Sequence, residues 1–306
     1  MNARSWLLLV VLLVVLVYVR CGPVGNPEPD RRRKVMADDP AHVLETSKDP
    51  YELVSTALTL ARSAQSRDFM TLQNSLSSAT FLRRLDSEED YTQPRDMLRI
   101  ALVLEALSKN RSPEATKTLV SLTSNSSFLA EASRIELLIE ALAEVRPAPP
   151  EVVQFWDKYS HPRGVYANLI IKATLDNRTT PAIALFEQKM TDPAYATGTK
   201  VAWMQWYVVP HRNDLPLLES CERLLMKGLP ENLRPNLVEV LFDYKASWYL
   251  PSDSVNAPPR EELSSIGRTQ LRKIGEYTLE NIPLTKEQKQ SIQNVLRSLD
   301  RSLFSP

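Results

Sequence analysis

Side chains suited to catalysis or metal binding are few and scattered in this chain. The three histidines, His42, His161 and His211, form no pair at helical spacing, and none lies beside a cysteine. The two cysteines, Cys21 and Cys221, are far apart, which excludes a disulfide framework and the usual zinc-ligand spacings. Glycine-rich phosphate loops, nucleophile elbows and Cys-x-x-Cys pairs are missing from the sequence. We therefore expect no catalytic residue, no metal site and no cofactor, in a protein that is not an enzyme.

The other polar residues give little indication of chemistry. Glutamates recur every four residues from Glu136 to Glu144, opposite the apolar side of the same expected helix, as on a solvated face. Asn110, Asn125 and Asn177 each begin an Asn-x-Ser/Thr triplet, which matters only in a secretory pathway. Lys and Arg together number 37, as do Asp and Glu. Because this balance leaves no surplus of positive charge for phosphates, we expect no nucleic-acid partner.

Aromatic side chains form the one concentration that favours binding. Four of the five tryptophans fall between residues 156 and 248, and the spacing of Trp203, Trp206 and Tyr207 gives one helical stripe. Trp and Tyr are favoured anchors of binding surfaces, although such a stripe also packs well in a core. The candidate partner-binding residues are Trp156, Trp203, Trp206, Tyr207 and Trp248.

The elements that must position these residues are helices recurring at a period in the thirties. Glycine is scarce, and Pro113, Pro150, Pro181 and Pro216 begin similar helices at steps of about 37, 31 and 35 residues. Each is followed by a second helix, and short polar turns separate the pairs (SKNRS, EVRPA, DNRTT and HRND). The rhythm extends in both directions and predicts about six antiparallel helix pairs. A general helical bundle is the alternative, but it does not require regular helix starts.

This pattern resembles that of HEAT-like repeats over about residues 67–250. It shares with them a proline near the start of a first helix, a turn as at Asp192-Pro193, and a second helix rich in Leu, Val and Ala. One helix pair cannot bury its own apolar face, and stacked neighbours do so for it. The resemblance implies an all-α solenoid that forms a curved binding scaffold, usually without catalysis. We therefore expect residues 50–306 to form a helical-repeat domain.

The N-terminus contains fourteen consecutive apolar residues without a charge, from Trp6 to Val19. A spanning helix needs about 20 residues, but Arg4 and Arg20 can extend to the interfaces, which also suit Trp6 and Tyr18. We expect residues 1–21 to form a single-pass signal-anchor that contacts membrane lipid through residues 5–20.

Two alternatives to an uncleaved anchor remain. A cleaved signal peptide needs small residues at its cleavage site, and residues 18–20 have none. A bacterial lipoprotein would begin at Cys21, although Arg20 stands where such signals carry Gly or Ala. The basic run at residues 31–34 favours a cytoplasmic body, whereas a short basic start before an apolar run favours export, so the side stays open. Residues 22–49 are rich in Pro, Gly and charge and are expected to form a flexible tether.

Three hypotheses for function follow. The first is a membrane-anchored scaffold that holds an unidentified protein partner along the solenoid. The second is an enzyme whose site is assembled from separate repeats; a deep pocket where His161 or His211 meets carboxylates would favour it. The third is an envelope structural component, similar to a bacterial lipoprotein, that acts through its anchor and self-association.

Overall fold

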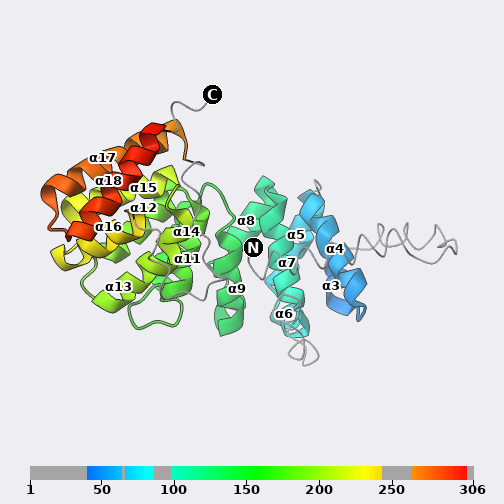
Figure 1. Ribbon diagram of the computed structural model, residues 1–306. Helices are drawn as coiled ribbons and strands as arrows, with labels where there is room; N and C mark the ends of the chain where they lie inside the picture. Colours follow the sequence, from blue (N-terminus) through cyan, green and yellow to red (C-terminus); the bar gives the residue numbers. More distant parts are fainter. Residues whose placement is uncertain (1–39, 64–65, 86–97, 243–262, 302–306) are drawn as a thin grey trace. The chain divides into compact units, whose positions relative to one another are not determined.

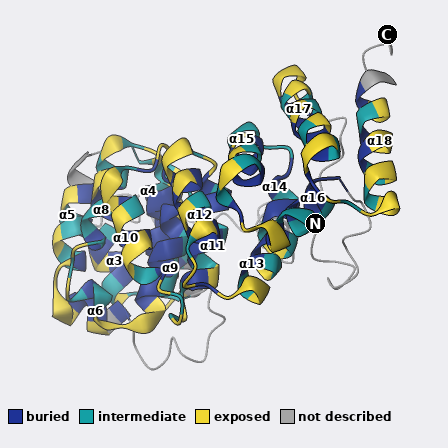
Figure 2. Ribbon diagram, turned by 90° about the vertical axis from the view of Figure 1, so that its left-hand side faces the viewer, coloured by how far each residue is buried: buried dark blue, intermediate teal, exposed yellow. Residues whose placement is uncertain are grey.

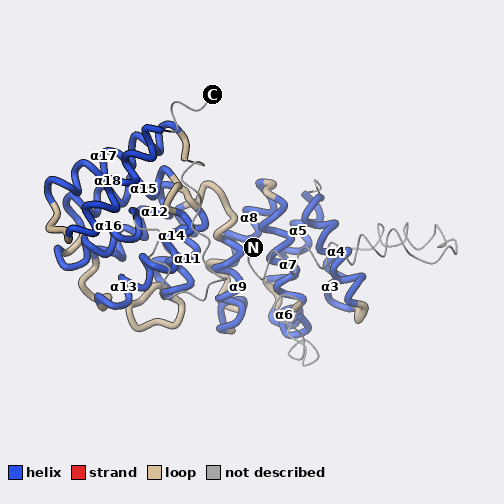
Figure 3. Tube along the Cα trace, viewed as in Figure 1, coloured by secondary structure: helices blue, strands red, loops and turns tan. Residues whose placement is uncertain are grey.

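The computed structural model describes residues 40–63, 66–85, 98–242 and 263–301, and within these ranges it contains helices and no strand (Figures 1 and 3). The all-α prediction is therefore confirmed. The helices up to residue 177 are α3 (Pro40–Thr46), α4 (Pro50–Arg62), α5 (Ser66–Leu76), α6 (Ala79–Leu85), α7 (Arg99–Asn110), α8 (Pro113–Leu122), η3 (Phe128–Ala130), α9 (Ala132–Leu142), α10 (Pro150–Tyr159) and α11 (Ala167–Asn177). The later helices are α12 (Thr180–Thr191), α13 (Thr197–Trp203), η4 (Met204–Val208), α14 (Val209–His211), α15 (Leu215–Arg223), η5 (Leu224–Gly228), η6 (Glu231–Leu233), α16 (Arg234–Phe242), α17 (Ser265–Asn281) and α18 (Lys286–Arg301).

The expected membrane anchor at residues 1–21 lies outside the described residues. Within the described ranges, no helix has the length and apolar character needed to cross a bilayer.

The described helices belong to two compact units rather than to one body. The N-terminal unit ends at Ala173 and the C-terminal unit begins at Thr174, within α11. The single domain expected at residues 50–306 is thus divided near its middle. Each unit is described below by itself.

In the N-terminal unit, helices that are not consecutive along the chain pack side by side. α7 packs against both α4 and α9, while α5 packs against α8. The two sets touch where α8 meets α7 and α9. Arg99, the first residue of α7, is buried and donates to the carbonyl oxygens of Leu44 and Glu45 at the end of α3, at 3.2 Å each. α3 therefore belongs to the packed body, although it lies inside the expected tether.

The C-terminal unit repeats this arrangement. α15 packs against α12 and α17, and α16 packs against η4 and α18 (Figure 1). Polar contacts link α12, α15 and α17. Arg223 of α15 makes a forked ion pair with Glu187 of α12, with N–O distances of 2.9–3.2 Å. On the other side of α15, Glu222 pairs with Lys273 of α17 at 2.6 Å. Exposed pairs of this kind contribute little energy but fix which helices meet.

The helix starts follow the prolines as expected. Pro113 and Pro150 occupy the first turns of α8 and α10, where a missing N–H costs nothing. Ser112 caps α8 by accepting the N–H of Ala115 at 3.1 Å. The helix that follows α10 begins at Ala167, after a turn closed by the hydrogen bond from the Gly164 N–H to the His161 carbonyl at 2.7 Å.

The core of each unit is formed by one apolar face of each helix (Figure 2). In the N-terminal unit it includes Leu104, Leu119, Phe128 and Leu138, none more than 1% exposed. The last described helix, α18, is strongly amphipathic: Ile292, Val295 and Leu299 are buried, and its remaining faces are polar. One amphipathic stripe is thus enough to attach each helix to its neighbours.

Two inter-helix turns that lie 67 residues apart in the sequence share the same backbone conformation. Arg111 and Arg178 adopt the left-handed conformation, with φ of 56° and 63°, each directly after an asparagine and before a Ser or Thr. The Asn110 carbonyl oxygen Oδ1 accepts the N–H of Ser112 at 3.2 Å, and Asn177 Oδ1 accepts the hydroxyl of Thr179. Asparagine therefore shapes the turn that ends one helix pair and begins the next.

The same asparagines connect helices that are distant in sequence. The Asn110 amide donates to the carbonyl oxygens of Leu60 and Ser63, at 2.6 and 2.8 Å, at the end of α4. Asn125 Nδ2 donates to the Leu76 carbonyl at the end of α5, at 3.4 Å, and its Oδ1 caps η3. Asn177 is fully buried. The side chains of Asn110 and Asn125 thus satisfy backbone groups at helix ends.

Replacing Asn110 with alanine is expected to lower the free energy of unfolding by about 1–2 kcal/mol, because two carbonyl oxygens at the end of α4 lose their donor. Asn74→Ala is the matched control, since Asn74 is exposed on α5, and its loss should stay within about 0.5 kcal/mol. Urea unfolding followed by circular dichroism measures both. Equal losses would contradict a role for Asn110 in joining α7 to α4.

Candidate functional site

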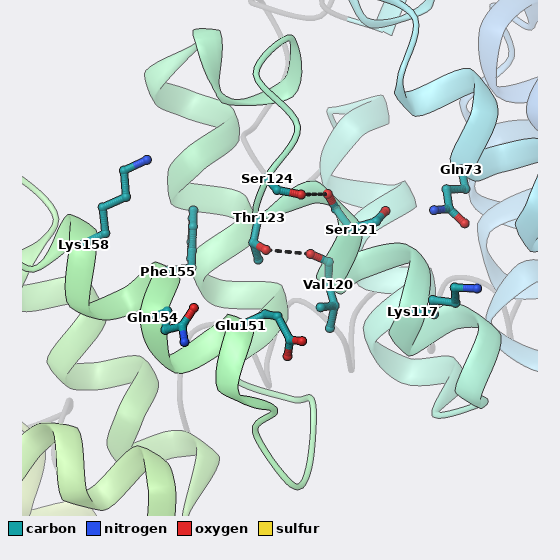
Figure 4. A pocket seen from close by; sticks show the side chains of 10 residues that line it. All are labelled: Gln73, Lys117, Val120, Ser121, Thr123, Ser124, Glu151, Gln154, Phe155 and Lys158. Carbon is teal, nitrogen blue, oxygen red and sulfur yellow. Dashed lines mark hydrogen bonds between the residues drawn. The ribbon is translucent and has the colours of Figure 1, made fainter.

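A groove in the N-terminal unit runs between α8 and α10 and has a volume of about 470 Å³ (Figure 4). Each helix contributes one stripe of residues with the spacing i, i+3, i+4 and i+7, which marks a single helical face. The α8 stripe is Lys117, Val120 and Ser121, continued by Ser124 in the turn after the helix, and the α10 stripe is Glu151, Gln154, Phe155 and Lys158. Thr123 and Gln73 of α5 complete the lining. We call this feature the α8–α10 groove.

The two stripes are related by the repeat. Each residue of the α10 stripe stands 34 residues after its counterpart on α8, as Lys117 and Glu151 illustrate. In Figure 4, Lys117 and Glu151 lie toward one end of the groove, and Ser124 and Lys158 lie toward the other. The groove is therefore built by one helix pair and its successor, each using the same positions.

The hydroxyl groups of the groove already donate hydrogen bonds to backbone carbonyl oxygens of the protein. Ser121 donates to the Thr118 carbonyl and Thr123 to the Val120 carbonyl, both at 2.7 Å, and Ser124 donates to the Ser121 carbonyl at 3.2 Å. Each hydroxyl oxygen therefore offers lone pairs, and it can accept a hydrogen bond from a bound molecule.

Three charged side chains of the groove have no salt-bridge partner among the described residues. In the described parts of the chain, no carboxylate lies within salt-bridge distance of Lys117 or Lys158, and no cation lies within that distance of Glu151. Lys158 instead has its ammonium 5.3 Å from the centre of the Tyr159 ring. The groove thus presents two positive charges and one negative charge to solvent.

Aromatic rings continue the groove at the end of α10. The rings of Phe155 and Tyr159 are 4.9 Å apart, and those of Tyr159 and Tyr166 are 6.0 Å apart in an edge-to-face arrangement. The Tyr166 hydroxyl donates to the Ala132 carbonyl at 3.4 Å, and Val165 beside it is 84% exposed. These contacts hold the rings in place and give the groove an apolar border.

The aromatic residues singled out from the sequence are distributed differently. Trp156 and Trp203 are 0% and 1% exposed, so the structure corrects their interpretation from partner contacts to core residues. Trp206 is 47% exposed and Tyr207 is partly buried, while Trp248 lies outside the described residues. The expected stripe is divided because η4 is a π-helix, whose wider turns place Trp206 on another face than Trp203.

His211 meets two carboxylates in the C-terminal unit. Its Nε2 lies 3.0 Å from Asp176 Oδ1 and its Nδ1 lies 3.1 Å from Asp214 Oδ2. Burial alone lowers the pKa of His211, but the hydrogen bonds and charges of Asp176 and Asp214 outweigh it and raise the pKa above its usual value. Arg178 adds a 3.2 Å contact to Asp214. Both ring nitrogens are thus engaged within the fold.

The remaining candidates for chemistry are separate from one another. His161 is exposed and its Nδ1 accepts the N–H of Arg163 at 3.3 Å. Cys221 is fully buried, and burial raises the pKa of its thiol to about 12, so it stays protonated and unreactive at neutral pH. In the ranges that the structure describes, no group of His, Cys, Asp and Glu side chains is arranged to hold a metal ion.

Comparison with protein-family models, with curated proteins and with solved structures found no match for this chain.

Proposed function

We propose that this protein is a membrane-anchored helical-repeat scaffold that holds a protein partner, with its described helices forming a HEAT-like α-solenoid. The observation that carries the proposal is the α8–α10 groove, a solvent-open surface built from equivalent positions of successive helix pairs. The anchor is residues 1–21, which hold the helical body at a membrane.

The packing in each unit supports a solenoid. One set of helices (α4, α7 and α9; then α12, α15 and α17) packs in succession, and a second set packs beside it. This is the arrangement in which each helix pair touches mainly its neighbours. The repeated Asn-Arg turns at Asn110 and Asn177 recur at about two repeat lengths, which supports one repeating unit along the chain.

Helix α18 offers little apolar surface for stacking. A polar outer face prevents the stacking of a further repeat or of another copy. α18 buries Ile292, Val295 and Leu299 and presents Lys, Glu, Gln and Asn side chains elsewhere. End-to-end assembly through this helix is therefore unfavourable, which favours a scaffold over a self-associating envelope component.

The character of the groove supports binding rather than catalysis. None of its lining residues is a histidine or cysteine, and the histidine that does meet carboxylates, His211, has both ring nitrogens occupied. Exposed Lys, Glu and Gln beside an aromatic border provide recognition by charge and hydrogen bonding.

The anchor has a direct test in native membranes. Because residues 5–20 are expected to contact the hydrocarbon region, the full-length protein should stay in the membrane pellet after washing with high salt and then with alkaline carbonate. Release by salt alone would contradict an anchor and leave only surface attachment. Mass spectrometry of the N-terminus separates an uncleaved anchor from a lipid-modified Cys21.

The scaffold has a second test, a crosslinked pull-down of the full-length protein from its own membranes. One partner recovered in near-stoichiometric amount is the expected result. Recovery of only lipids and abundant bystanders would contradict the scaffold. Light scattering of the detergent-solubilised full chain adds a control, because a particle containing several copies would favour the self-associating component.

A further inference from the structure

We infer that the α8–α10 groove binds a short extended peptide segment carrying one basic and one acidic side chain on either side of an apolar residue. This inference rests on the proposed scaffold function and names the chemical class of its partner. It is argued from the length, hydrogen-bonding groups and charges of the groove.

The length of the groove sets the length of the segment. Glu151 and Lys158 are seven residues apart on α10, which corresponds to about 10 Å along the helix. An extended chain covers this distance with about three residues. The volume of about 470 Å³ lies in the range of ordinary ligand sites.

The hydrogen-bonding groups match a peptide backbone. The hydroxyl oxygens of Ser121, Thr123 and Ser124 accept, and they fit the N–H groups of an extended chain. Gln73 and Gln154 stand at the two sides of the groove, and each side-chain amide offers both a donor and an acceptor. An extended backbone alternates these same two kinds of group.

The charges disfavour a uniformly anionic ligand at the end of the groove that holds Glu151. Lys117 and Lys158 attract acidic groups, but Glu151 lies at the same end as Lys117 and repels them there (Figure 4). A nucleic acid or an anionic lipid surface therefore meets a favourable and an unfavourable charge together. A peptide with a basic side chain near Glu151 and an acidic one near Lys158 pairs with these two charges, and the Lys117 ammonium can donate to a backbone carbonyl oxygen of the peptide. The central apolar side chain of the peptide lies against Phe155 and Val120.

The test is a specificity switch in the full-length protein, purified in a nonionic detergent. The probes are two fluorescein-labelled peptides with blocked ends and Gly-Ser flanks, one with a Lys-Leu-Glu core and one with a Glu-Leu-Glu core. We expect the wild-type protein to bind the mixed core at least tenfold more tightly, about 1.4 kcal/mol. In Glu151→Lys the preference should invert, and Lys158→Glu should weaken both complexes at least tenfold.

Lys227→Glu is the control variant, because Lys227 is an exposed lysine in the C-terminal unit and should leave both affinities unchanged. Fluorescence anisotropy measures binding, and circular dichroism establishes that each variant is folded. Equal binding of the two cores by the wild type, or an unchanged preference in Glu151→Lys, would overturn the inference. Wild-type preference for the all-acidic core would also overturn it and would assign the groove to uniformly anionic ligands.

The pull-down separates this inference from the scaffold itself. If the wild-type chain recovers a partner and the Glu151→Lys/Lys158→Glu variant recovers it equally well, the groove is not the contact while the scaffold function stands. If neither chain recovers a partner, the scaffold function fails. Loss of the partner in the variant alone, together with the inverted peptide preference, supports both.

Discussion

Replacing Trp156 with alanine is expected to lower the free energy of unfolding by about 3 kcal/mol, at the low end of the range for a buried aromatic. Trp156 lies on α10 and is fully buried, so the change leaves a cavity beside Phe155. One term acts in the opposite direction, because the Trp156 indole N–H has no hydrogen-bond acceptor among the described residues. Removing an unpaired buried donor recovers part of the loss.

Two further variants separate these contributions. Trp156→Phe keeps most of the apolar ring and removes the unpaired N–H, so its loss should stay below about 1.5 kcal/mol. Trp206→Ala removes a ring that is 47% exposed and should cost about 1 kcal/mol or less. Urea unfolding of the three variants measures how much unfolding free energy each one loses. Equal losses for Trp156→Ala and Trp206→Ala would contradict the division of the aromatic residues into core and surface.

The helix starts could be predicted from the sequence where a proline marks them. Pro113, Pro150 and Pro216 stand in the first turns of α8, α10 and α15, because proline is tolerated there and not further along a helix. Short helices are harder to predict, with or without a proline. α3 and α6, of seven residues each, are too short to show a helical period, and although α3 begins at Pro40, its three buried residues lie within a charged, proline-rich segment.

The candidate site was harder to predict because its residues resemble a solvated surface. Lys117, Ser121 and Ser124 have the composition of any exposed helix face, and only the packing of α8 and α10 turns that face into a groove wall. One sequence signal could have located it. The 34-residue period, applied to the polar positions instead of the prolines, aligns Lys117 with Glu151 and Ser124 with Lys158.

The aromatic stripe shows the opposite problem, since its sequence signal was clear and its interpretation depended on backbone geometry. Trp203 and Trp206 share a face only if the helix keeps its regular turn. The π-helix at η4 breaks that regularity, and it leaves Trp203 packed edge-to-face on Tyr195 at 5.0 Å. Hydrophobic spacing alone does not reveal a π-turn.

His211 stands 34 residues after Asn177, but the Arg212 that follows it is right-handed, whereas Arg178 is left-handed. The raised pKa of His211 means that the ring is charged in the folded protein at pH values where an unfolded histidine, with a pKa of about 6.5, loses its proton. The stability that it contributes is therefore complete below about pH 6.5 and is lost as the pH rises through the folded pKa. The ring contacts Asp176 and Asp214, and these carboxylates in turn have Tyr207 near Asp176 and Arg178 beside Asp214.

Replacing His211 with alanine should lower the free energy of unfolding by about 2–3 kcal/mol at pH 6, because Asp176 and Asp214 lose a cationic partner, and only Asp214 keeps another in Arg178. The loss should shrink as the pH rises through the folded pKa, because the wild-type ring then loses its own proton. His211→Asn is the matched control, since asparagine keeps a polar side chain at this position without titrating. Relative to this control, the wild-type protein should lose stability between pH 6 and pH 9. A constant difference in unfolding free energy between the two proteins over that range, or an NMR titration of His211 with a pKa below about 6.5, would contradict a protonated His211 between the two carboxylates.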